Sequence, residues 1–199
     1  MTTFDHETLD RVERYAGPVF TVYSDKVTMS SGGTATRDVV ENKGAVGIVA
    51  LDDVGRVVLV RQYRHPVHQR LWEVPAGLRD VHGEDLLITA RRELAEETDW
   101  TAERFDLLVD LHTSPGFSNE TIRMFLARDL TPVPVAERHR RTEEEADLEI
   151  AWFDLDEAVA MILRGEISNC STVAALLAAA RARDDGWATL RPADTPPAG

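Results

Sequence analysis

Three glutamates lie within five residues of one stretch, RRELAEETDW (residues 91–100). On a helix, at 100° per residue, Glu96 lies about 60° to one side of Glu93 and Glu97 about 40° to the other, so the three carboxylates share one face. Like charges four residues apart cost about 0.2–0.5 kcal/mol per pair, and Arg92 can offset part of this by pairing with Glu96. Such a cluster is either a solvated acidic face or a site for a divalent cation, since carboxylate oxygens suit Mg²⁺ and Mn²⁺.

The elements around this stretch predict an α+β fold. Apolar or small residues at positions 86, 87, 90 and 94 repeat at the helical period and predict a helix over residues 85–98. Two further helices are predicted at residues 155–166 and 171–183. Strands are predicted at residues 18–29, 34–42, 45–53, 56–64, 71–78, 105–113, 121–130 and 148–155, the first two joined by an SSGG turn. Because the strands come in hairpins and the helices are few, a layered mixed sheet is expected rather than a Rossmann-type chain.

Charge and composition restrict the class of protein. The net charge of −13 argues against nucleic-acid binding, which depends on clustered Lys and Arg, and it requires local cations for any anionic substrate. The only cysteine, Cys170, cannot form an internal disulfide, which favours the cytoplasm. No run of 18 apolar residues is present and the charged N-terminus lacks a signal-peptide core, so no membrane partner is expected.

The region around the glutamates resembles the signature of the Nudix hydrolases. AGLRDVHGEDLLITARRELAEETDW carries the glycine of that signature at Gly77, a glutamate at Glu84 and then Arg92-Glu93-Leu94-Ala95-Glu96-Glu97. Two departures occur: six residues instead of five separate Gly77 from Glu84, and Asp99 replaces the usual glycine after the helix. An extra loop residue is easily absorbed, and Asp tolerates left-handed geometry, so the end of the helix should survive.

The resemblance implies a metal site with assigned roles. Glu93 and Glu97 match the principal ligand positions, and the backbone carbonyl of Ala76 matches a third. Glu96 and Glu84 match positions that support or join the cluster, and Arg92 matches an arginine that orients a glutamate. Mg²⁺ is the implied ion, with Mn²⁺ as the alternative. In this family the metals bridge phosphate oxygens and activate water.

Other segments resemble the ADP-ribose pyrophosphatase branch of the family, particularly its actinobacterial members. Pro115 lies 15 residues beyond Trp100, at about the distance typical of that branch, although a Pro-Gly turn between strands would explain it equally. The segments TRDVV, YRH, LWEVPAGL and RGEISN match as well, and the resemblance covers about residues 18–182. The implied reaction is the hydrolysis of ADP-ribose to AMP and ribose 5-phosphate.

The matching segments supply candidate substrate-binding residues. Arg37 and Arg64 are the cations that a phosphate would need, and the alternative for each is a surface ion pair. Trp72 could stack on the substrate or pack in the core. Leu78, at the end of LWEVPAGL, and Pro115 complete the implied binding set.

The general base is implied in the loop RHRRTEEEADLEI, before the last strand. Aligning on its Glu-Glu-Ala-Asp element favours Glu145, with Glu144 as the alternative, and either could instead belong to a solvated charged turn.

The resemblance implies the Nudix α/β/α sandwich with a mixed sheet, preceded by a small N-terminal antiparallel β-sheet. The expected organisation is a β-sheet dimerisation region at residues 1–45, a Nudix domain at 46–185 and a loose tail at 186–199. In this branch the N-terminal region packs across a homodimer and helps to build the partner's site. The rival functions are a Nudix pyrophosphatase for another nucleotide sugar and a Nudix-derived ADP-ribose sensor, and retention of the glutamates argues against the sensor.

Overall fold

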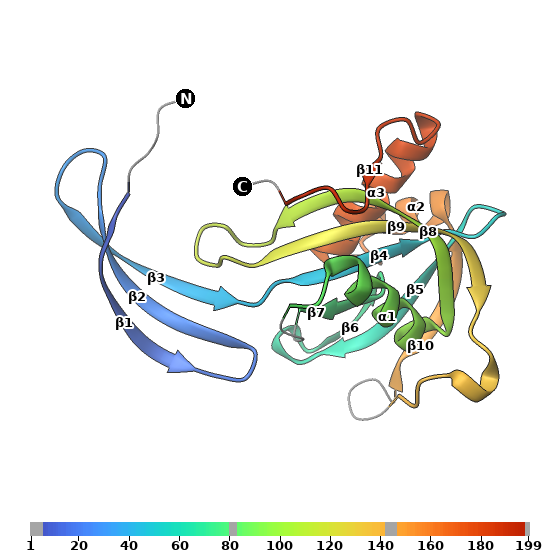
Figure 1. Ribbon diagram of the computed structural model, residues 1–199, viewed down its shortest axis with the longest axis horizontal. Coiled ribbons are helices and arrows are strands. Elements are labelled where there is room, and N and C mark those ends of the chain that lie inside the picture. The colour runs from blue at the N-terminus through green and yellow to red at the C-terminus, as the bar shows by residue number, and fades with distance from the viewer. Residues whose placement is uncertain (1–5, 80–82, 142–146, 198–199) are drawn as a thin grey trace. The chain divides into compact units, whose positions relative to one another are not determined.

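The computed structural model describes residues 6–79, 83–141 and 147–197 (Figure 1). The chain divides into two compact units. The first consists of Met1–Gly44 together with His112–Thr121, and the second of Ala45–Leu111 together with Ile122–Gly199. Each unit has its own sheet structure.

The first unit is built on a three-stranded antiparallel sheet in the order β1-β2-β3. β2 (Phe20–Thr28) and β3 (Thr34–Asn42) form the predicted hairpin, and Gly32 and Gly33 in its turn both have a φ of 85°. β1 (Thr8–Ala16) was not predicted from the sequence. The turn at residues 113–120 lies beside β3, because the amide of Val40 donates to the carbonyl of Phe117 (2.7 Å) and that of Asn119 to the carbonyl of Val40 (3.2 Å).

The described residues of the second unit form two sheets. The larger has the order β11-β8-β9-β4-β7, and the smaller the order β10-β5-β6. β4 pairs in parallel with β9 and antiparallel with β7, so the larger sheet is mixed. The strands are β4 (Ala45–Ala50), β5 (Arg56–Arg64), β6 (Gln69–Glu73), β7 (Ala76–Leu78), β8 (Trp100–His112), β9 (Thr121–Pro132), β10 (Glu149–Asp154) and β11 (Arg191–Pro192).

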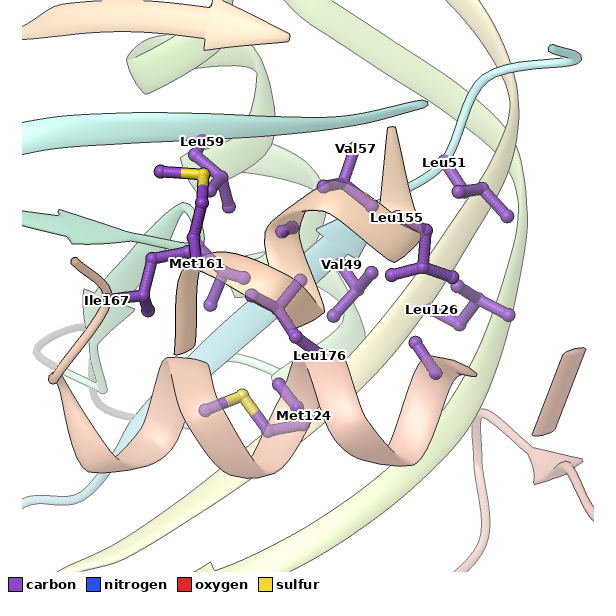
Figure 2. Close-up of a cluster of buried hydrophobic side chains, with 14 residues drawn as sticks. Val49, Leu51, Val57, Leu59, Met124, Leu126, Leu155, Met161, Ile167 and Leu176 are labelled. Carbon is purple, nitrogen blue, oxygen red and sulfur yellow. The ribbon is translucent and has the colours of Figure 1, made fainter. Parts of the chain in front are cut away.

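Helices cover both faces of β4, because its side chains alternate between two hydrophobic clusters. Val46, Ile48 and Ala50 pack with residues of α1 (Leu86–Thr98). Val49 packs instead with residues of α2 (Leu155–Leu163) and α3 (Cys170–Asp184), and Figure 2 shows this second cluster. Every residue of β4 is buried. The predicted α/β/α layering with a mixed sheet is therefore confirmed.

The loose tail predicted for residues 186–199 differs from what is seen in its described part. β11 pairs with Leu107 and Asp106 of β8, at the edge of the larger sheet. The carbonyl of Thr195 accepts a hydrogen bond from Arg123 (2.7 Å), whose side chain is almost fully buried. These contacts hold the segment because the edge of β8 offers unpaired backbone groups. No helix in the described part of the chain is long and apolar enough to cross a membrane.

Candidate active site

The glutamate-rich stretch forms the C-terminal half of α1, as predicted. Asp85 caps the start of the helix by accepting a hydrogen bond from the amide of Leu87 (2.8 Å). Asp99 ends it in the left-handed conformation, with φ 62° and ψ 28°, as expected for a residue replacing glycine. Ala90 and Leu94 bury one face in the core, and Glu93 and Glu97 lie on the same buried half, only 8% and 5% exposed. Glu93 and Glu97 therefore face the protein rather than solvent, unlike glutamates of a solvated acidic face.

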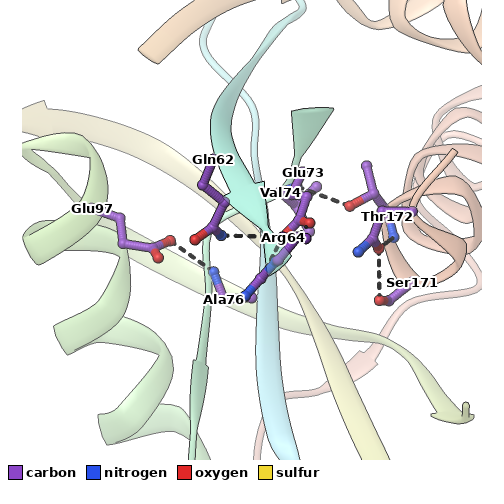
Figure 3. A network of polar contacts seen from close by, with 9 residues as sticks. Gln62, Arg64, Glu73, Val74, Ala76, Glu97, Ser171 and Thr172 are labelled. Carbon is purple, nitrogen blue, oxygen red and sulfur yellow. Dashed lines mark hydrogen bonds and ion pairs between the residues drawn. The ribbon is translucent and has the colours of Figure 1, made fainter. Parts of the chain in front are cut away.

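Strand β7 lies directly against these two carboxylates. The amide of Ala76 donates a hydrogen bond to Oε2 of Glu97 (2.9 Å; Figure 3). A β-carbon on Gly77 would overlap the carboxyl group of Glu93, which explains physically why glycine stands at the start of the signature. The contact between β7 and α1 thus brings together Ala76, Glu93 and Glu97, three residues predicted to share one site.

Arg92 links three carboxylates of the cluster. Its Nη1 lies 2.6 Å from Oε1 of Glu93 and 3.0 Å from Oε2 of Glu96, and its Nη2 lies 3.4 Å from Oε2 of Glu84. Glu84 is held in turn by the hydroxyl of Thr89 (2.8 Å). Burial lowers the pKa of Arg92, but the charge of Glu93 and the hydrogen bond with Glu96 outweigh it and keep the pKa above its ordinary value. The predicted role of Arg92 in orienting glutamates agrees with these contacts.

The donor chemistry of this cluster suits a hard divalent cation. Three carboxylates share one guanidinium, and carboxylate oxygens are the ligands that Mg²⁺ prefers. Within the ranges that the structure describes, no group of three or more His, Cys, Asp or Glu side chains is arranged as a ready-made metal site. The residues fit such an ion by their type, and Glu93 and Glu97 also by their burial.

A second polar network lies on the strands that lead to β7 (Figure 3). Glu73 is 3% exposed and accepts hydrogen bonds from Nε (3.0 Å) and Nη2 (2.6 Å) of Arg64 and from the side-chain Nε2 of Gln62 (3.2 Å). Gln62 and Arg64 share one face of β5, as its alternation predicts. Arg64 thus combines a two-point ion pair with a side chain that is 42% exposed.

Trp72 and Leu78 occupy different environments. Trp72 packs edge-on against Phe153, with ring centroids 5.1 Å apart. It lies against the hydrophobic cluster that contains Val49 and residues of α2 and α3, and Arg61 lies over its ring. Its packing role was one of the two predicted alternatives. Leu78, at the end of β7, is exposed.

Two contributors were missed from the sequence, Glu73 and Thr172. The hydroxyl of Thr172, in the first turn of α3, accepts a hydrogen bond from the amide of Val74 (3.1 Å), and Asn169 caps that turn (3.0 Å). The contact between Val74 and Thr172 spans 98 residues and therefore leaves no local pattern in the sequence.

Arg37 and Pro115 meet within the first unit, where they line a cavity of about 300 Å³. Asp25, Asp38 and Phe117 also line it. Asp25 is held by Arg11 (2.8 and 2.7 Å), and this hydrogen bonding lowers the pKa of Asp25. Asp38 accepts a hydrogen bond from Ser24 (2.6 Å). In the described part of the chain Arg37 forms no ion pair, and its hydrogen bonds go to the carbonyl of Thr36 and to Met29. Arg37 is therefore a cation available to a ligand in this cavity.

The predicted general bases, Glu144 and Glu145, lie outside the described residues. The described chain on either side is tied down: Arg141 contacts the end of α1, and the carbonyl of Asp147 accepts a hydrogen bond from Arg70 (2.6 Å).

The fold and the carboxylate helix define the class of protein. The NUDIX domain model matches residues 41–175, which is more than half of the chain, and the chain therefore belongs to the Nudix family of hydrolases. It is 46% identical to the ADP-ribose pyrophosphatase of Mycobacterium tuberculosis over 195 residues, which cover 98% of this chain and 92% of that protein. It is 31% identical to the ADP-ribose pyrophosphatase of Bacillus subtilis over 176 residues, 88% of this chain and 93% of that protein.

A solved structure agrees with the fold. The crystal structure of an ADP compounds hydrolase superposes with a TM-score of 0.77 at 22% identity, covering 91% of this chain and 96% of that one. The resemblance inferred from the signature is thus confirmed at the level of the family.

Proposed function

We propose that this Nudix hydrolase cleaves the pyrophosphate of ADP-ribose, giving AMP and ribose 5-phosphate. The observation that carries the proposal is the 46% identity, over nearly the whole chain, to a protein named ADP-ribose pyrophosphatase. The buried carboxylates of α1 support the pyrophosphatase chemistry, and Arg37 in its cavity supports the recognition of an anionic substrate.

Mg²⁺ is the proposed cofactor, with Mn²⁺ as a substitute. Glu93, Glu97 and the carbonyl of Ala76 would hold it, Glu96 and Glu84 would support it, and Arg92 would orient the glutamates. When bound, the ion neutralises phosphate charge and lowers the pKa of an attacking water. The amide of Ala76 already orients Glu97 by a direct hydrogen bond.

The remaining site residues divide between charge and shape. Arg37 and Arg64 would bind phosphate or ribose oxygens, and Trp72, Leu78 and Pro115 would shape the site. Arg64 is pre-oriented by its two bonds to Glu73, which reduces the side-chain entropy lost on binding. Glu145, or Glu144 in the alternative alignment, would act as the general base on water.

The proposed active form is a cytoplasmic homodimer assembled through residues 1–45. Apolar side chains exposed on β1 and in the turn after it support this assembly, because a monomer would leave them in water: Leu9, Val12, Tyr15 and Val19. The free and exposed Cys170 agrees with a reducing compartment.

A substrate screen tests the proposal. Purified protein is assayed with ADP-ribose, ADP-glucose, GDP-mannose and a diadenosine polyphosphate, each with Mg²⁺ and with EDTA. The expected kcat/KM for ADP-ribose exceeds that of the others by at least about tenfold, or about 1.4 kcal/mol of transition-state preference. Faster cleavage of another nucleotide sugar would show that this compound, rather than ADP-ribose, is the preferred substrate. Tight binding of ADP-ribose without turnover would favour the alternative function, an ADP-ribose sensor.

A further inference from the structure

Arg61 and Arg64, both on β5, form ion pairs of different kinds. Nη1 of Arg61 lies 3.6 Å from Oε2 of Glu149, and these side chains are 41% and 52% exposed. An exposed pair at this distance contributes little to stability. Nη2 of Arg64 lies 2.6 Å from Oε2 of Glu73, and its Nε donates to Oε1 of the same carboxylate (3.0 Å). This two-point contact fixes the plane of the guanidinium, which a single contact does not.

The burial of Glu73 makes the contact with Arg64 costly to break. The side chain of Glu73 is 3% exposed, and Nε2 of Gln62 donates to its Oε2 as well (3.2 Å). A carboxylate that has been taken out of water becomes strongly unfavourable when its cation is removed. Rotation of Arg64 away from Glu73 would incur this penalty. Arg64 is therefore held in one orientation even though 42% of its own side chain is exposed.

The segment from Glu73 to Ala76 is itself tied to its surroundings. The amide of Val74 donates to α3 (3.1 Å), the carbonyl of Pro75 accepts from β4 (2.8 Å) and the amide of Ala76 donates to α1 (2.9 Å). Three consecutive residues are thus hydrogen-bonded to three different elements. This stretch is a rigid connection between the carboxylate that holds Arg64 and the strand whose carbonyl is proposed as a metal ligand.

We propose that Glu73 is a positioning residue that sets the place of Arg64 relative to the metal-binding carboxylates, so that one pyrophosphate contacts both. The inference rests on the proposed function, in which Arg64 binds the substrate and Ala76 holds the metal. Glu73 acts through Arg64, because its own carboxylate is buried beneath that contact. A cation held in advance loses less side-chain entropy when the substrate binds, and this lowers KM.

Glu73→Gln and Glu73→Asp test the proposal by steady-state kinetics with ADP-ribose. Glutamine keeps the shape but removes the charge, whereas aspartate keeps the charge but shortens the reach by one methylene. Both are expected to raise KM about three- to tenfold, the loss expected when one long side chain must be ordered on binding, with kcat changed by less than about twofold. A merely structural ion pair would be restored by aspartate, so a normal KM in Glu73→Asp would overturn the proposal.

Two further variants separate positioning from other effects. Glu149→Gln removes the carboxylate of the exposed pair with Arg61 on the same strand, and this matched control should leave KM unchanged. The double variant Arg64→Ala/Glu73→Gln should have the KM of Arg64→Ala alone, because Glu73 acts through Arg64. Increases in KM that multiply in the double variant would contradict the proposal. So would an increase in Glu149→Gln as large as that in Glu73→Gln.

Two measurements need no substrate. In isotope-labelled protein, the NMR signal of the Nε–H of Arg64, assigned by its loss in Arg64→Lys, should exchange with water faster in Glu73→Gln than in the unsubstituted protein. Mn²⁺ binding, followed by electron paramagnetic resonance, should be unchanged in Glu73→Gln, because the carboxylates of α1 are intact. Equal exchange, or weaker Mn²⁺ binding, would refute the proposal. The expected exchange difference in a protein that fails to cleave ADP-ribose would support the positioning of Arg64 and refute only the proposed substrate.

Discussion

The carboxyl group of Glu93 lies directly against the backbone of Gly77, with no room for a β-carbon between them. We expect Gly77→Ala to push Glu93 away and to lower kcat by about ten- to a hundredfold, the range seen when the support of a metal ligand is lost. Because Gly77 has no positive φ, the backbone itself should tolerate alanine. Steady-state kinetics with a Mg²⁺ titration measures the effect, and circular dichroism checks that the variant retains its fold. Normal kinetics for Gly77→Ala would refute the close approach.

Glu97→Gln should retain the fold but lose at least about a hundredfold in kcat at saturating Mg²⁺, more than the loss of a supporting residue costs. Glutamine keeps the shape and still accepts the hydrogen bond from Ala76, but it removes the charge that a cation needs. Circular dichroism and kinetics measure the two expectations, and Glu103→Gln, at an exposed position on β8, is the control. Turnover near that of the control would show that Glu97 is not a metal ligand.

Glu145→Gln should reduce kcat by about 10²–10⁴ with little change in KM, as is typical for loss of a general base. Glu144→Gln is the matched comparison, because it removes the same charge one residue away. If Glu144→Gln causes the loss instead, the alternative alignment of the loop is correct. The kcat–pH profile adds an independent measurement, since loss of the base should abolish its acidic limb.

Arg37 provides a test of the dimer. If Arg37 of one protomer serves the site of its partner, Arg37→Ala and Glu97→Gln should each be nearly inactive. An equimolar mixture of the two should nevertheless regain about a quarter of full activity. Half of the dimers then contain one protomer of each variant, and one of the two sites in each such dimer is complete. Light scattering establishes the oligomeric state of each sample. An active monomer, or a mixture without recovery after subunit exchange, would sink the shared-site proposal.

Local patterns were sufficient to predict α1 and its boundaries. The helical period and the left-handed tolerance of Asp99 act within a few residues of one another, so the sequence contains the information that predicts this helix. The same holds for the hairpin of β2 and β3, whose turn glycines have positive φ.

Elements without a buried face could not be predicted in this way. All nine residues of β1 are exposed, so the strand has no apolar alternation, and β11 is only two residues long. Arg64 illustrates the corresponding difficulty in the site. Its charge and strand position were evident from the sequence, but its ion pair depends on Glu73, a residue on the neighbouring strand.

The hydrogen bond between Val74 and Thr172 has a consequence for how the protein is made. Val74 lies two residues before Ala76, and its amide donates a hydrogen bond to the hydroxyl of Thr172 in the first turn of α3. On the ribosome, the N-terminal part of a chain emerges first and begins to fold before the rest exists. The connection between β6 and β7 can therefore gain this hydrogen bond only after residue 172 has been translated. A chain released before residue 172 would lack this contact between the segment preceding β7 and α3.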